Sequence, residues 1–396
     1  MPGGVARVYP ASGAVAMLPL TPDNNYEPTI IFCGGIFLAD DQWGSYSFPA
    51  VNTFDIPNSN DCQRITPEPQ DGSQPVYIQD DDMLESRSMG QFIILPDETL
   101  LIVNGGSMGT AGYAQQTGQT HSFAQMPFGE SLASEPALTP ALYNPNAPAG
   151  SRWSRVGFQA STIPRLYHSS AVLLPDTSVM IAGSNPNIDV NTSTVFPTTY
   201  IAEKFYPAYF NASVRPSPNG IPSNLTYGGQ PFDITFSNTS WDTTKMDANA
   251  AAAATKVIVI RPGFSTHAMN MGQRALRLNT TYSVSNTGVV TVHVSQMPPN
   301  PNLFQPGPGF MYVVIDGVPS NGTMVIIGNG QIGTQPVDNS TYILPASTHA
   351  TSLLGSNGNS TQAKSNSGGA IGLMRREGLG ALVGILGASV LGASLF

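Results

Sequence analysis

The chain has 396 residues, enough for two or three domains, and only 10% of them are charged. The formal net charge is −9, and Lys and Arg form no basic cluster beyond Arg375-Arg376, which argues against nucleic-acid binding. The 40 Gly and 34 Pro residues, many in Asn-Gly, Asp-Gly, Gly-Gly and Asn-Pro pairs, indicate a turn-rich, all-β fold.

Three segments in the first half of the chain share one layout. Each has an apolar strand, a Leu-Pro turn, a second apolar strand and a break of small residues, and they cover residues 12–35, 87–106 and 165–184. Recurrent hairpins that end in paired glycines are typical of kelch-type β-propeller blades. We therefore predict that residues 1–212 form the later blades of a propeller. Further strands are expected at 76–78 and 141–143, and a closing strand at 199–205.

A second domain follows a proline-rich boundary at Pro207 and Arg215-Pro216-Ser217-Pro218. Short strands are then expected over 232–236, 256–260, 273–278, 289–294, 310–316 and 324–327. Their even spacing, with turn residues between them, predicts an immunoglobulin-like β-sandwich over residues 213–345. The Ala-rich residues 248–254 are expected to be a loop insertion.

The last segment, residues 346–396, is rich in Ser, Thr, Asn and Gly and ends in the apolar stretch 378–396. It is expected to be a disordered linker and a hydrophobic tail. The small residues Asn366-Ser367-Gly368, a polar spacer and the apolar end fit a GPI-attachment signal. A tail anchor and an apolar terminus without function are the alternatives.

Two features favour a secreted or cell-surface protein. The chain has two cysteines, Cys33 and Cys62, and eight N-x-S/T sequons, at Asn191, Asn211, Asn224, Asn238, Asn279, Asn321, Asn339 and Asn359. A disulfide between the cysteines would stabilise the fold by about 3–4 kcal/mol, whereas two free buried thiols are the alternative. Residues 1–7 lack the apolar segment of a signal peptide, so we expect that the front of the protein is missing.

The candidate chemistry lies in two separate segments. Tyr167 and His168 precede the apolar strand of the third hairpin, and a phenol with an imidazole suits copper(II). A partly buried aromatic residue beside a hydrogen-bonded histidine is the alternative. His267 lies in the middle of residues 261–274, which join two sandwich strands and are longer than a hairpin requires. The alternative for His267 is an ordinary solvated loop residue.

Together these two segments resemble the copper-ligand motifs of the copper radical oxidases, which are the fungal glyoxal oxidases and, more distantly, galactose oxidase. Residues 202–209 and 297–302 are also similar to glyoxal oxidase, and the resemblance covers about residues 1–345. It implies a seven-bladed propeller and a sandwich loop that inserts His267 into the propeller axis. Copper(II) would be held by His168, His267, Tyr167 as the axial phenolate, and a second tyrosine cross-linked to a cysteine, which carries a radical. Tyr167 would also take the substrate hydroxyl proton.

The resemblance implies oxidation of simple aldehydes, such as glyoxal and methylglyoxal, to carboxylic acids. O2 would be reduced to H2O2, which peroxidases could use. The cross-linked tyrosine and cysteine are expected upstream of this chain, because Cys33 and Cys62 stand where the family has a structural disulfide. The 396 residues are therefore expected to be an inactive fragment. The alternatives are an alcohol or galactose-type oxidase and a non-catalytic cell-surface propeller–sandwich that binds carbohydrate or protein.

The remaining candidate residues are weaker. His293 alternates with valines and is expected on the outer face of a strand, while His121 lies in a polar loop and His349 in the tail. The acidic run Asp80-Asp81-Asp82 with Glu85 could bind Ca²⁺, but it lacks the spacing of a known calcium loop. A solvated turn or helix start is favoured for it.

Overall fold

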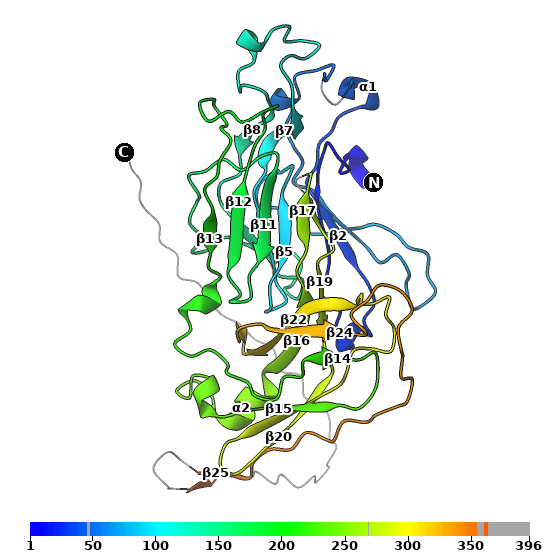
Figure 1. Ribbon diagram of the computed structural model, residues 1–396, viewed down its shortest axis with the longest axis vertical. Helices are drawn as coiled ribbons and strands as arrows, with labels where there is room; N and C mark the ends of the chain where they lie inside the picture. Colours follow the sequence, from blue (N-terminus) through cyan, green and yellow to red (C-terminus); the bar gives the residue numbers. More distant parts are fainter. Residues whose placement is uncertain (46–47, 268, 355–359, 363–396) are drawn as a thin grey trace, which may run out of the picture. The chain divides into compact units, whose positions relative to one another are not determined.

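The computed structural model describes residues 1–45, 48–267, 269–354 and 360–362, and these are nearly all β-structure (Figure 1). The two α-helices among them are short, α1 at Asp40–Trp43 and α2 at Ala248–Ala253. Single 3-10 turns lie at Pro2–Gly4, Pro22–Asn24, Thr53–Asp55, Phe123–Gln125, Ala208–Asn211 and Asn238–Ser240. The all-β prediction is confirmed.

Three consecutive small sheets form the blades of the first half (Figure 1). The first has the order β1-β2-β3-β4, at Ala14–Met17, Ile30–Cys33, Cys62–Ile65 and Ile78–Gln79. The second has the order β5-β6-β9-β10, at Gln91–Ile94, Leu100–Val103, Ala141–Tyr143 and Trp153–Ser154. The third has the order β11-β12-β13, at Ser169–Leu173, Val179–Gly183 and Glu203–Phe205. A separate hairpin, β7 at Gly106–Tyr113 and β8 at Ser131–Pro136, is inserted in the second blade.

All three predicted Leu-Pro hairpins form antiparallel pairs, β1 with β2, β5 with β6 and β11 with β12. Two other predicted strands are shorter than expected. Of residues 76–78 only Ile78 belongs to β4, and of 199–205 only the last three residues form β13. Only these residues pair with the neighbouring strand, Ile78 and Gln79 with β3 and Glu203 to Phe205 with β12.

The small-residue breaks after the hairpins are the places where the next blade approaches. Gly34 has φ +71°, and a Cβ added there would lie 2.0 Å from the carbonyl oxygen of Arg87. Gly105 has φ +88° and donates its backbone N–H to the carbonyl of Arg165 at 2.8 Å. Only glycine combines this backbone conformation with so close a backbone contact. The paired glycines therefore mark the joints between blades.

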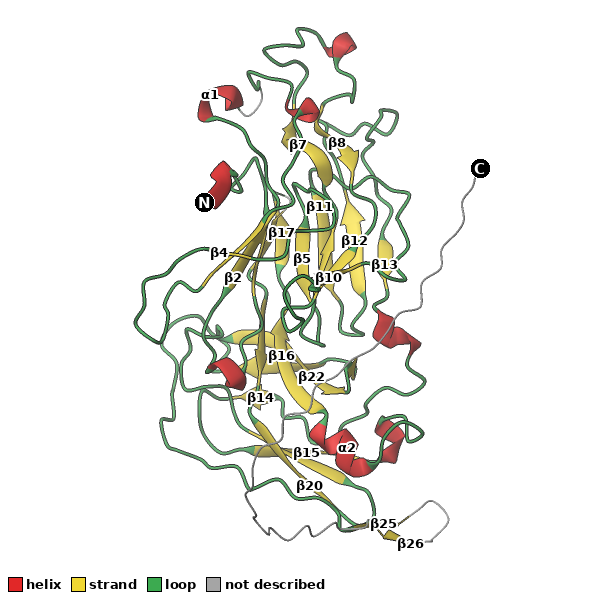
Figure 2. Ribbon diagram, turned by 180° about the vertical axis from the view of Figure 1, so that it is seen from behind, coloured by secondary structure: helices red, strands yellow, loops and turns green. Residues whose placement is uncertain are grey.

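The sandwich consists of two main sheets (Figure 2). The larger has the order β14-β24-β22-β16-β19, with β23 beside β22, at Asn224–Leu225, Thr323–Ile327, Gly307–Ile315, Thr255–Arg261, Arg274–Arg277 and Val318–Pro319. The smaller has the order β15-β21-β20, at Phe232–Phe236, Val290–Val294 and Thr280–Val284. Their buried faces share one apolar core that includes Ile234, Val257 and Val292. A further hairpin pairs β17, Phe264–Thr266, with β18, Met269–Met271.

The prediction of a loop at the Ala-rich residues 248–254 is wrong, because Ala248–Ala253 form helix α2. Asp247 caps the helix by accepting the backbone N–H of Ala250 at 2.8 Å. Alanine has the highest helix propensity, and the apolar side of the helix is buried at Ala248, Ala251 and Ala252. Local sequence signals were therefore sufficient to predict this helix.

The first residues of the segment expected to be disordered, from Ala346 on, contact the sandwich. Thr348 donates its backbone N–H to Tyr282 at 2.8 Å, and Ala350 is buried and exchanges hydrogen bonds with Asn249. A short pair, β25 at Ser352–Leu354 and β26 at Ser360–Gln362, follows. The GPI-type signal at 366–396 lies outside the described residues. Among the residues that the structure describes, no helix has the length and apolar character needed to cross a membrane.

Candidate metal centre

Tyr167 and His168 lie in the loop that enters β11. Their rings are stacked with centroids 3.9 Å apart, and Tyr167 is buried while His168 is exposed. His168 Nδ1 is 2.9 Å from the carbonyl oxygen of Asn185. Such a contact selects the tautomer with the proton on Nδ1, so that Nε2 is available as a metal ligand.

His267 lies at the tip of the β17–β18 hairpin of the sandwich. Strand β17 contacts β11, and β18 contacts both β1 and β5. The hairpin therefore reaches the first strands of all three blades. His267 Nδ1 is 2.9 Å from Thr266 Oγ1, which again leaves Nε2 for another partner.

Tyr9 joins these two regions, and the sequence analysis missed it. Its hydroxyl is 3.4 Å from the hydroxyl of Tyr167, and its ring is edge-on to His267 with centroids 5.1 Å apart. Arg7-Val8-Tyr9 has the same spacing as Arg165-Leu166-Tyr167, which could have revealed it. The first repeat predicted from the sequence begins only at Ser12, after this signal.

The structure thus places residues from the first blade, the third blade and the sandwich hairpin around Tyr9. The role of Tyr167, His168 and His267 as copper ligands stays a prediction. Among the described residues, no group of three or more His, Cys, Asp and Glu side chains could hold a metal ion. A metal here would need the phenol oxygen beside the two imidazoles. This mixed O and N donor set fits copper(II).

Both histidines have a left-handed backbone, with φ 62° at His168 and 52° at His267. Each such conformation costs about 1–3 kcal/mol and persists only where the surroundings impose it. Non-glycine residues in this region are concentrated at functional sites. Ten other described residues that are not glycine also have a positive φ, so this conformation by itself assigns no role to either histidine.

The Tyr167 phenol is strongly perturbed. Burial raises its pKa well above 10, and the hydrogen bond with Tyr9 and the nearby Tyr113 raise it further. The free phenol is therefore protonated at neutral pH, and a bound cation would have to displace that proton. Tyr113 also forms one wall of a hollow of about 490 Å³ that is lined by Phe48, Phe123 and Ile188. Tyr167 and His168 do not line this hollow, but the ring of Tyr113 separates it from Tyr167, with ring centroids 6.3 Å apart.

The other histidines have different roles. His293 Nδ1 is 2.7 Å from Asp233 Oδ1 and its Nε2 is 2.8 Å from Ser283 Oγ, so both nitrogens are occupied on the sandwich surface. His349 Nε2 is 3.1 Å from the hydroxyl of Tyr282. His121 is exposed in its loop.

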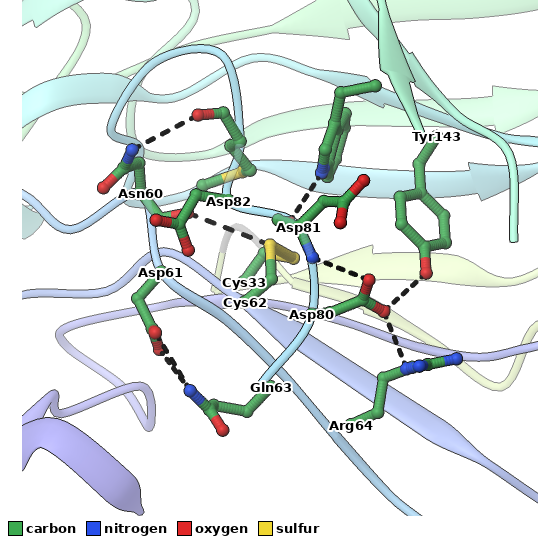
Figure 3. Close-up of a disulfide and its surroundings, with 12 residues drawn as sticks. Cys33, Asn60, Asp61, Cys62, Gln63, Arg64, Asp80, Asp81, Asp82 and Tyr143 are labelled. Atoms are coloured by element: carbon green, nitrogen blue, oxygen red, sulfur yellow. Dashed lines mark hydrogen bonds and ion pairs between the residues drawn. A yellow bond between two sulfur atoms is a disulfide. The ribbon is translucent and has the colours of Figure 1, made fainter. Parts of the chain in front are cut away.

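Cys33 and Cys62 form a disulfide between the adjacent strands β2 and β3, as predicted (Figure 3). Both are fully buried, and their Cα atoms are 4.1 Å apart. These are the only two cysteines of the chain. Neither is therefore available for a thioether bond to a tyrosine.

The acidic run after β4 links the first two blades through protein contacts, which argues against the calcium alternative. Asp80 pairs with Arg64 and accepts the hydroxyl of Tyr143 at 2.6 Å (Figure 3). It also pairs with Arg152. Glu85 pairs with Arg87 and Arg155. Cations and N–H or O–H donors thus already satisfy these oxygens.

Asp81 should give the fold a measurable acid dependence. It accepts the backbone N–H groups of Gly150 at 2.8 Å and Arg152 at 3.0 Å, and these lower its pKa below the usual 3.8. A carboxylate whose pKa is lower in the folded than in the unfolded protein stabilises the folded state at pH values above its unfolded-state pKa. This stabilisation is lost as the pH falls through its folded-state pKa.

We expect Asp81→Asn to be less stable than the wild type at pH 7, with the difference shrinking as the pH falls below the usual Asp pKa. Urea unfolding at pH 7 and at about pH 3 measures this. A difference that is the same at both pH values would contradict an ionised, hydrogen-bonded Asp81.

Two family models match the chain. One, described as the glyoxal oxidase N-terminus, matches residues 1–209, and the other, described as a galactose oxidase-like Early set domain, matches residues 215–327. The second match covers the sandwich strands from β14 to β24.

Several known proteins are similar to the chain. An aldehyde oxidase of Vitis pseudoreticulata is 32% identical over 320 residues, 80% of this chain and 53% of that protein. An aldehyde oxidase of Arabidopsis thaliana is 32% identical over 337 residues, 83% of this chain and 49% of that protein. A galactose oxidase of Gibberella zeae is 25% identical over 237 residues, 59% of this chain and 28% of that protein. The chain thus spans about half the length of the two aldehyde oxidases.

A solved structure, of a fungal alcohol oxidase in complex with copper, has the same fold. Its TM-score is 0.55 at 18% sequence identity, and the match covers 80% of this chain and 54% of that one. The predicted architecture, later kelch-type blades followed by an immunoglobulin-like sandwich, is therefore confirmed.

Proposed function

Given that the chain belongs to the glyoxal oxidase family, we propose that Tyr167, His168 and His267 bind copper(II) in an enzyme that oxidises small aldehydes. The observation that carries the proposal is the position of Tyr9, whose ring and hydroxyl touch His267 and Tyr167 from the two domains at once. When bound, copper would supply a one-electron acceptor, as in the copper radical oxidases that the sequence resembles.

The residues of this chain would bind the metal, orient the ligand atoms and exchange a proton with the substrate. The Nδ1 contacts of His168 and His267 orient their Nε2 atoms, and Tyr167 Oη is the proton-exchanging atom. As a phenolate it can accept the hydroxyl proton of a hydrated aldehyde, with Tyr9 at 3.4 Å as its hydrogen-bond partner. The rings of Tyr9 and Tyr113 pack beside Tyr167 and limit the access of water.

The substrates that we propose are glyoxal and methylglyoxal, oxidised to carboxylic acids while O2 is reduced to H2O2. Peroxidases that consume H2O2 are the proposed partners. The aldehyde oxidases among the relatives support aldehydes over the alcohol or galactose-type alternative. Because both cysteines form the disulfide, we propose that no residue pair of this chain provides the Tyr–Cys thioether.

Electron counting gives a direct test. Oxidising an aldehyde hydrate to an acid removes two electrons, and copper(II) alone accepts one. We therefore expect the copper-loaded 396-residue chain to produce no H2O2 from methylglyoxal in a peroxidase-coupled assay. A longer protein that also contains a free cysteine and its tyrosine partner should turn over. Robust turnover by the 396 residues would instead show that a tyrosine such as Tyr113 or Tyr143 provides the second electron acceptor.

We further propose a secreted or cell-surface location with a GPI-type end. The buried disulfide supports an oxidising compartment. The sequon asparagines Asn211, Asn224, Asn238, Asn279, Asn321 and Asn339 are all exposed, as glycosylation requires. Enzymatic removal of N-glycans should lower the apparent mass, and phosphatidylinositol-specific phospholipase C should release the protein from membranes. An unchanged mass and membrane fraction would contradict this location.

A further inference from the structure

Gln91 occupies a central position between the two ligand-bearing segments. It is the first residue of β5 and is completely buried. Strand β5 contacts β1 on one side and β11 on the other, and it also contacts the sandwich hairpin through β18. The side chain of Gln91 therefore meets the third blade and the sandwich hairpin at one point.

The amide nitrogen of Gln91 fixes the segment that carries His168. Gln91 Nε2 donates to the carbonyl oxygen of Ser169 at 2.8 Å, and Ser169 Oγ lies 3.4 Å from the same nitrogen. Ser169 directly follows His168 and is itself buried. This contact therefore holds the backbone next to the left-handed His168.

The amide oxygen of Gln91 fixes the segment that carries His267. Ser265 Oγ donates to Gln91 Oε1 at 3.0 Å, and Ser265 lies two residues before His267 in β17. Two further contacts, from Asn270 and Gln273 to the carbonyl oxygen of Phe92, hold the other end of the hairpin to β5. Those two join the hairpin to β5 alone, whereas Gln91 also contacts the His168 segment.

We propose that Gln91 is a positioning residue that sets the separation of His168 and His267, and thereby the affinity and coordination geometry of the copper site. The inference rests on the proposed copper function. A neutral amide suits this place because it donates with its nitrogen and accepts with its oxygen. An ionised Glu would present only acceptors to the Ser169 carbonyl, and Met would present neither group.

The test measures Cu(II) binding directly, by competition with a chromophoric chelator, together with the EPR spectrum of the copper-loaded protein and the melting temperature without copper. Gln91→Met should weaken Cu(II) binding about 10- to 100-fold and change the EPR spectrum, as loss of an outer-shell partner does. Ser265→Ala, which removes one hydrogen bond, should weaken it about two- to tenfold. The double variant should lose less than the sum of the two effects, because both variants remove the same contact.

Asn58→Leu is the matched control. Asn58 is also a buried amide, and it donates to Ser88 Oγ at 3.0 Å and the carbonyl of Gly106 at 2.8 Å, so neither of its partners is a candidate ligand or a residue of the sandwich hairpin. It should lower the melting temperature and leave Cu(II) affinity and the EPR spectrum unchanged. An equal loss of affinity in Asn58→Leu would show a general stability effect and overturn the role of Gln91.

The outcomes separate the two proposals. Absence of Cu(II) binding in the wild type, or wild-type affinity in His168→Ala, overturns the copper site and the inference with it. If those two behave as expected, wild-type affinity and an unchanged spectrum in Gln91→Met overturn the inference alone. Should Gln91→Met not fold, wild-type affinity in Ser265→Ala, whose side chain is only half-buried, overturns it.

Discussion

Replacing His267 by Ala is expected to weaken Cu(II) binding by more than about 100-fold. Loss of outer-shell partners already costs about 10- to 100-fold, and His267 supplies one of only two imidazoles in the proposed donor set. Its ring is exposed but packs edge-on to Tyr9, and a water molecule in its place would be a weaker copper(II) ligand than the imidazole nitrogen. Chelator competition on the copper-free protein measures the change.

His293→Ala is the control for this prediction. His293 is also on the sandwich, but Asp233 and Ser283 occupy both its nitrogens. Its removal should leave Cu(II) affinity unchanged. Equal affinities for His267→Ala and the wild type would place the metal elsewhere.

Copper should also link the third blade to the sandwich hairpin, because His168 and His267 come from these two parts. Copper at 100 times its dissociation constant would stabilise the folded state by about 2.7 kcal/mol, provided the unfolded chain does not bind it. The melting temperature of the wild type should therefore rise with copper, and that of His267→Ala should not.

The second large effect is expected at Arg87, where substitution by Leu should lower the free energy of unfolding by about 3–5 kcal/mol. Arg87 is almost completely buried, pairs with Glu85 and donates to the carbonyls of Asn104 at 2.6 Å and Thr139 at 3.1 Å. Burial lowers the pKa of its guanidinium to about 10, and the group remains charged at neutral pH. Leu would leave these buried carbonyls without donors.

Arg155→Ala is the matched comparison, because Arg155 pairs with the same Glu85 at 3.1 Å but is about one-third exposed. An ion pair in contact with solvent contributes about 0–1 kcal/mol. Urea unfolding of both variants at pH 7 measures the contrast. Similar losses would mean that the ion pair, and not the buried carbonyl contacts of Arg87, dominates at this joint.

The sequence predicted the strands and turns that depend on residues close together along the chain. The three Leu-Pro hairpins were predicted because apolar alternation and turn residues act over a few positions, and the sandwich strands for the same reason. The helix at Ala248–Ala253 has equally local signals, Asp247 and a run of alanines, although a loop was predicted there.

By itself, then, the sequence determined the all-β class, the hairpins, the cysteine pair and the two motifs that carry Tyr167, His168 and His267. The repeated Arg-x-Tyr spacing could mark Tyr9 as a candidate, but only the tertiary structure decided that Tyr9 contacts Tyr167 and His267 and that Gln91 joins their segments. Tyr9 and Tyr167 are 158 residues apart, and Gln91 and Ser265 are 174 apart. No local periodicity encodes contacts of that range, because they depend on how the blades and the sandwich hairpin pack.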